Sequence, residues 1–145
     1  MDPLETISTR RRILLFWSLL AATLLVMAIL QLDGQVLKNE QAPFGIVSYE
    51  LTGSVTGAQA ILVSWDPNAR IHAAFNLGLD YLFMPLYAAT IGLGCLWAAE
   101  IWRVRKRQIG YLGTWLVWAL WLAAAFDAVE NIALLRMLYT QAISP

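Results

Sequence analysis

At residues 110–131 the chain reads GYLGTWLVWALWLAAAFDAVEN, an apolar run rich in tryptophan that ends in Asp127, Glu130 and Asn131. An ionisable group inside or at the edge of a membrane span is costly, so such groups are generally paired or functional. This stretch therefore predicts a membrane-crossing helix with a candidate site at its end.

The composition of the whole chain agrees with a membrane protein. Of its 145 residues, 59% are hydrophobic and 14% are charged, whereas ordinary soluble domains are about 45–50% apolar and about 25% charged. Ten basic and ten acidic residues balance, so no overall field attracts nucleic acid. No metal-binding spacing of Cys and His and no nucleotide-binding glycine loop is present, and we expect neither a metal nor a cofactor. The lipid bilayer is the expected partner.

Two further apolar runs complete the predicted fold. The run from Ile13 to Leu32 carries no charge and has the roughly 20 residues that a helix needs to cross a membrane. Asp66-Pro67 is a strong helix start, and the helix that it opens runs to about Val104. We expect one all-α, polytopic helical membrane domain over residues 1–145, with three spans at about 13–32, 77–101 and 109–131 and a helical extension over 132–143. The abrupt end of the sequence leaves room for a fourth span in a longer form of the protein.

Residues 33–72 form a segment between the first two spans. Pro43 and several glycines interrupt it, yet it keeps apolar clusters that a solvated linker would not need. Ala58, Ile61, Leu62 and Trp65 recur at helical spacing, which predicts a short amphipathic helix capped by Ser54 or Thr56. We expect this segment to lie on the membrane surface or to pack on protruding helix ends.

Positive charge predicts the orientation of the chain. Arg10–Arg12 precede the first span, and four basic residues lie in the loop at 102–108, whereas the segment at 33–72 has Lys38 and Arg70. Basic residues accumulate on the cytoplasmic side. We therefore expect a cytoplasmic N-terminus, a cytoplasmic basic loop and an outer-face segment at 33–72.

The acidic residues of the second and third spans are predicted to lie at a similar depth. At about 1.5 Å per residue, Asp127 lies roughly 27 Å from Ile109, and Asp80 lies about 30 Å from Glu100. Both positions fall near the outer boundary of the hydrocarbon. Other polar residues share these helix faces, and Glu50 could join from the outer-face segment. The candidate ligand-binding residues are Asp80, Asp127, Glu130, Asn131, Asn76, His72, Tyr87 and Glu50.

Two interpretations of these residues stay open. Three acids this close together require that one holds a proton, or that Arg70, Arg136, His72 or a bound cation offsets the charge. Alternatively, the acids and amides simply form hydrogen bonds across the helix interface. No catalytic residue is assigned by either interpretation.

Three stretches also resemble a group of small uncharacterised bacterial integral membrane proteins. They are GIVSYEL at 45–51, LDYLFMPLY at 79–87 and DAVEN at 127–131, and the resemblance covers about Phe44 to Leu138. It implies a bacterial inner membrane and a shared site, but no activity. A looser analogy links the chain to the sterol-isomerase and sigma-2 receptor superfamily, whose small helical bundles have intramembrane acids facing an apolar ligand cavity; no motif aligns.

Three hypotheses of function follow. The first is a protein that binds a lipid, an apolar small molecule or a partner helix in an acidic pocket near the outer face. The second is an accessory subunit of a larger membrane complex or of a homo-oligomer, with the acids in an interhelical network. The third is a membrane-embedded enzyme that uses Asp/Glu acid–base or cation chemistry.

Overall fold

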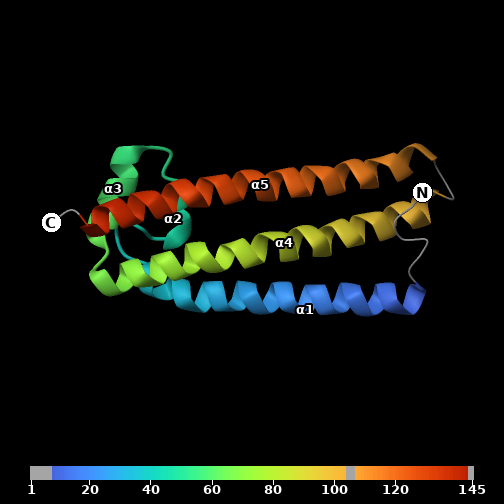
Figure 1. The fold of residues 1–145 in the computed structure, drawn as a ribbon, viewed down its shortest axis with the longest axis horizontal. Coiled ribbons are helices and arrows are strands. Elements are labelled where there is room, and N and C mark those ends of the chain that lie inside the picture. The colour runs from blue at the N-terminus through green and yellow to red at the C-terminus, as the bar shows by residue number, and fades with distance from the viewer. Residues whose placement is uncertain (1–7, 104–106, 144–145) are drawn as a thin grey trace. The chain divides into compact units, whose positions relative to one another are not determined.

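A computed structural model of the chain describes residues 8–103 and 107–143, and every regular element in that part is helical. Figure 1 shows the three long helices and the two short helices α2 and α3. In chain order the elements are α1 (Thr9–Asp33), the 3-10 helix η1 (Gly34–Leu37), α2 (Ile46–Glu50), α3 (Val55–Ser64), α4 (Pro67–Arg103) and α5 (Arg107–Ile143).

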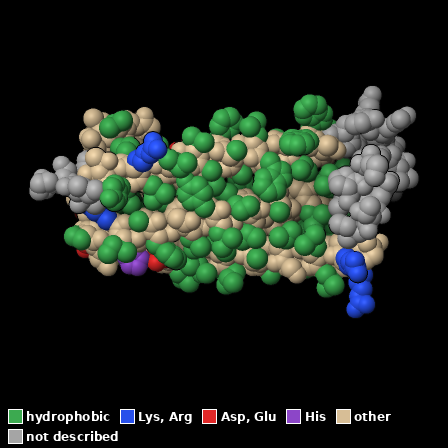
Figure 2. Space-filling model, in the orientation of Figure 1, with side chains coloured by type: hydrophobic (Ala, Val, Ile, Leu, Met, Phe, Trp, Pro, Cys, Tyr) green, Lys and Arg blue, Asp and Glu red, His purple; other side chains and the backbone are tan. Residues whose placement is uncertain are grey.

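Three of the helices are long and apolar enough to cross a membrane. The apolar stretches are Thr9–Leu37, Pro67–Ile101 and Leu112–Thr140. Only 11% of the most apolar window is buried in the first and third of these, so most of their apolar surface is left to face lipid. Figure 2 shows the hydrophobic side chains spread over the visible surface of the long helices. The predicted class is confirmed: the chain is an all-α, multi-pass membrane protein with three spans.

Local sequence signals explain where the helices begin. The side chain of Asp66 accepts a hydrogen bond from the backbone N–H of Ala69 at 2.7 Å, and Pro67 occupies the first helical position of α4. The hydroxyl of Ser54 accepts from the N–H of Gly57 at 3.1 Å and caps α3. Both arrangements satisfy backbone donors that the first turn of a helix leaves unpaired.

The helix α5 runs without a break through Asp127–Asn131 to Ile143, as expected for a span with a helical extension. With 37 residues each, α4 and α5 are about 55 Å long. A hydrocarbon core is about 30 Å thick, so a large part of each helix lies beyond it. The predicted basic loop at 102–108 falls partly on residues 104–106, which lie outside the described residues.

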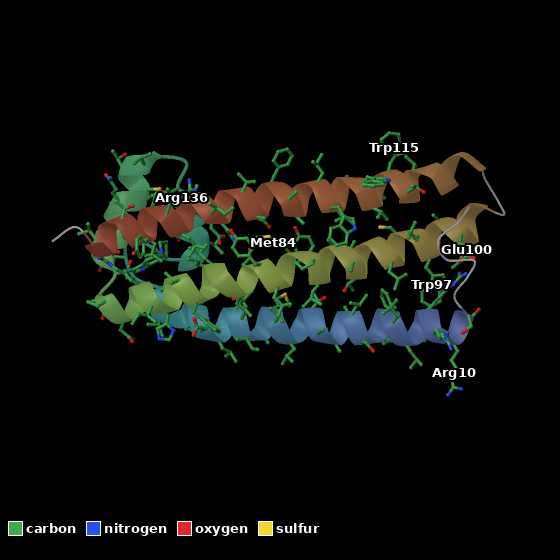
Figure 3. All side chains as sticks on the ribbon, viewed as in Figure 1. Arg10, Met84, Trp97, Glu100, Trp115 and Arg136 are labelled. Atoms are coloured by element: carbon green, nitrogen blue, oxygen red, sulfur yellow. The ribbon has the colours of Figure 1, made fainter. Side chains whose placement is uncertain are left out.

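The chain divides into two compact units. The first unit contains residues 1–25 and 83–126. In it, the Thr23 and Thr90 hydroxyls are 2.9 Å apart, and Arg12 Nη1 donates to Glu100 Oε2 at 2.8 Å, so both contacts join α1 to α4. Figure 3 labels Glu100 on α4. A Cβ at Gly113 would overlap Ala99, so α5 and α4 approach closely there.

The second unit contains residues 26–82 and 127–145. Here the short helices α2 and α3 lie beside the ends of α4 and α5 (Figure 1). The segment at 33–72 thus packs on the ends of long helices, the second of the two placements considered for it. Its apolar residues build a core with both long helices; the most buried members are Leu37, Ala42, Tyr49, Leu62, Ala73 and Leu77.

Candidate functional site

Asp33, the last residue of α1, receives two of the polar side chains predicted for the site. His72 Nδ1 lies 2.8 Å from Asp33 Oδ1, and Asn76 Nδ2 donates to Asp33 Oδ2. His72 and Asn76 are one turn apart on α4, so both reach the same carboxyl group. The prediction placed these two residues on one face with Asp80, but the structure pairs them with Asp33, which was not among the predicted site residues.

Asp80 is bonded instead to α5. Asn131 Nδ2 donates to Asp80 Oδ2 at 2.8 Å, and only 2% of Asn131 is exposed. On the neighbouring turn, the Tyr81 hydroxyl donates to the carbonyl oxygen of Ala128 at 2.9 Å. Two hydrogen bonds therefore join α4 to α5 in the second unit, which is the arrangement expected of an interhelical network.

Glu50, at the end of α2, lies within electrostatic range of three other acids. Burial, as the largest cause, and the charges of Asp80, Asp127 and Glu130 together raise the pKa of its carboxyl group from 4.5 to about 7. A half-buried carboxyl group beside like charges is easier to protonate than a solvated one. Glu50 therefore exchanges a proton near neutral pH.

Tyr49 fixes the helix that carries Glu50. Its side chain is fully buried, and its hydroxyl donates to the carbonyl oxygen of Leu134 on α5 at 3.0 Å. The ring meets Trp65 edge-on at a centroid distance of 5.6 Å, and Trp65 Nε1 donates to the Leu37 carbonyl oxygen at 2.8 Å. Burial raises the pKa of Tyr49 to about 12, so the hydroxyl stays a donor. Sequence reasoning missed this anchor, although Tyr49 lies within a quoted motif.

Tyr87 lies in the first unit, whereas the other predicted site residues lie in the second. It packs against Phe83 on the same helix with ring centroids 5.4 Å apart. The structure thus gives Tyr87 an aromatic contact within its own unit.

A groove of about 900 Å³ lies in the second unit between the first turns of α4 and the last turns of α5. We call it the α4–α5 groove. None of the eight predicted ligand-binding residues lines it. Its lining is mainly apolar, with one arginine on each helix, and consists of Pro67, Arg70, Ile71, Ala74, Ile132, Leu135, Arg136, Leu138, Tyr139 and Thr140. The sequence predicted an outward-opening pocket lined by acids, whereas the lining of this groove contains no acidic residue.

The two arginines of the groove do not neutralise the acids. Within the described residues, neither Arg70 nor Arg136 forms an ion pair with a carboxylate. Sequence reasoning considered both as counter-charges for the acidic residues, but it did not place them in a common groove. Residues four apart on a helix share a face, so Arg70 lies beside Ala74 and Arg136 lies beside Thr140. This spacing was the signal that the sequence offered for the groove.

No group of three or more His, Cys, Asp and Glu side chains in the described part of the chain is arranged to hold a metal ion. Comparisons with family models, with curated proteins and with solved structures gave no match. We therefore infer a function from the geometry of the second unit.

Proposed function

We propose that this chain is a small integral protein of the bacterial inner membrane that binds a membrane lipid in the α4–α5 groove. The observation that carries the proposal is the groove itself, with its volume of about 900 Å³ and its mainly apolar lining. Ligand sites of roughly 300–1,000 Å³ hold molecules of drug size, and one acyl chain belongs to that range. Ile71, Ile132 and Leu135 offer this chain an apolar wall.

The acidic residues have a different role in this proposal. Asp80 is engaged by Asn131, and Asp33 is engaged by His72 and Asn76. Buried polar groups that are satisfied in this way hold helices together. The acids therefore support the walls of the second unit, and the lipid is held elsewhere.

The proposed orientation rests on the distribution of basic residues. Arg10–Arg12 lie at the start of α1, and the sequence has four further basic residues at 103–107, of which Arg103 ends α4 and Arg107 begins α5. The positive-inside tendency places these segments in the cytoplasm. The α4–α5 groove is then at the outer face, where outer-leaflet lipid is available.

Lipid retention by variants of the full chain tests the proposal. Ala74→Trp inserts a large side chain into the groove, whereas Ala60→Trp makes the same change on the exposed side of α3. We expect the protein purified in mild detergent to retain phospholipid, Ala74→Trp to lose most of it, and Ala60→Trp to retain it. Equal phospholipid per protein in all three samples would contradict the proposal.

A second candidate is an accessory subunit of a larger membrane complex or of a homo-oligomer. The Asp80–Asn131 and Tyr81–Ala128 hydrogen bonds are compatible with it, because this candidate also assigns the polar residues to a structural network. Native mass spectrometry of gently solubilised membranes distinguishes the two. A partner or a second copy at fixed stoichiometry supports the accessory subunit, and a lipid-bearing monomer counts against it.

A further inference from the structure

We infer that the lipid in the α4–α5 groove is an anionic phospholipid whose phosphate is bound by Arg70 and Arg136. This inference rests on the proposed function and specifies the chemistry of its ligand. Two observations support it: each wall of the groove contributes one arginine, and the lining contains no acidic residue.

Arg70 is held in place by the end of α3. Its Nε donates to the carbonyl oxygens of Leu62 and Trp65, both at 3.1 Å. These bonds use the Nε of a guanidinium group that has five N–H donors in a fixed fork. The side chain is thus oriented by the protein, and Arg70 lines the groove with N–H donors that these two bonds do not use.

Arg136 stands on the opposite wall and is exposed. Figure 3 shows it extending from α5 in the part of that helix flanked by α2 and α3. No hydrogen bond or ion pair of its guanidinium group to another described residue is present in the structure. Its charge is therefore available to a ligand.

The residues around the two arginines fit a lipid that carries a phosphate group better than a lipid that has none. A guanidinium group binds phosphate oxygens through two parallel N–H bonds, and it does so more strongly in an environment that excludes water. Ile71, Ile132 and Leu135 place apolar surface in the same groove, and this surface fits an acyl chain. Tyr139 and Thr140 also belong to the lining.

No carboxylate of the described residues forms an ion pair with either arginine. Asp80 accepts from Asn131, and Asp33 accepts from Asn76. Two positive charges beside apolar surface are thus left without a protein counter-ion in the described residues. A lipid phosphate supplies the missing negative charge.

The experiment measures binding of single lipids to the full chain in detergent by native mass spectrometry. Phosphatidylglycerol, which is anionic, is compared with phosphatidylcholine, which has no net charge. Both lipids carry a phosphate, but the quaternary ammonium group of phosphatidylcholine is repelled by the two guanidinium groups, so we expect phosphatidylglycerol to bind about tenfold more tightly. Arg136→Gln should abolish this preference.

Two controls accompany that variant. Lys38→Gln removes an exposed positive charge from the same unit outside the groove, and it should keep the preference. Arg70→Lys keeps the charge and loses the fork, and it should weaken phosphatidylglycerol binding without removing it. Thermal unfolding of Arg136→Gln should match that of the wild type, because its side chain forms no bond within the described residues.

The outcomes separate the inference from the proposed function. If both lipids bind equally and Ala74→Trp weakens both, the groove binds lipid but the inference of an anionic ligand is overturned. If Ala74→Trp changes neither, both the proposed function and the inference fail. A preference that survives in Arg136→Gln also overturns the inference, as does displacement of phosphatidylglycerol by an acidic peptide, which would indicate a protein segment as the occupant.

Discussion

Glu50 is the residue whose protonation is most sensitive to pH near neutrality. Its pKa is raised from 4.5 to about 7 by burial and by the charges of Asp80, Asp127 and Glu130. Because the folded state binds the proton more tightly than the unfolded chain, this group favours folding below pH 4.5 and disfavours it as the pH rises through 7. We predict that Glu50→Gln stabilises the protein by about 1–3 kcal/mol at pH 8 and by less than about 1 kcal/mol at pH 5.

Thermal unfolding in detergent at both pH values checks this prediction. Glu40→Gln changes an exposed glutamate of the same unit and serves as the matched control. We expect the control to melt like the wild type at both pH values. A Glu50→Gln variant that melts at the wild-type temperature at pH 8 would show that the carboxyl group is solvated there.

At the scale of elements, the Asp80–Asn131 hydrogen bond is the main polar link between α4 and α5 in the second unit. We predict that a double-mutant cycle with Asp80→Leu and Asn131→Leu gives a coupling energy of about 1–2 kcal/mol, since each single variant leaves a polar group without its partner. Unfolding of the four proteins in denaturant measures it. The side chain of Asn39 donates a hydrogen bond to Ser64 instead, so the losses of stability in Asn39→Leu and Asn131→Leu should add. A coupling energy of zero between Asp80→Leu and Asn131→Leu would argue against the link.

The bounds of the elements were largely predictable because local signals determine them. Ser54 and Asp66-Pro67 cap helices through residues only three positions away, and an uncharged run of sufficient length predicts a span by itself. The partners of the helix faces were not predictable in the same way. Periodicity put His72, Asn76 and Asp80 on one stripe of α4, but it could not show that two of them meet Asp33 on α1 and the third meets Asn131 on α5.

At the scale of the whole molecule, the distribution of charge predicts the topology. In a Cys95→Ala background, we expect Ser54→Cys to react with an impermeant maleimide applied to spheroplasts, and Ser8→Cys to react only after the membrane is opened. Both positions are exposed, and α1 lies between them. Reaction of Ser8→Cys in sealed spheroplasts would show that the chain has the opposite orientation, with the groove on the cytoplasmic side.

The candidate site was only partly predictable from the sequence. Its general location at the ends of α4 and α5 follows from where charges interrupt the apolar runs. Glu50 lies within electrostatic range of Asp80, Asp127 and Glu130, but it does not line the groove. The α4–α5 groove depends on how the first turns of one helix lie against the last turns of another. Residues such as Ala74 and Leu135 look like ordinary apolar surface until that arrangement is known.

Photocrosslinking tests lipid binding in the α4–α5 groove most directly. Full-length protein is reconstituted with phosphatidylglycerol that carries a diazirine in one acyl chain, irradiated, digested and mapped by mass spectrometry. We predict crosslinks at residues 67–74 and 132–140 that disappear in Ala74→Trp and persist in Ala60→Trp. Crosslinks confined to exposed lipid-facing positions such as Leu82 and Trp118, with no change in Ala74→Trp, would contradict lipid binding in the groove.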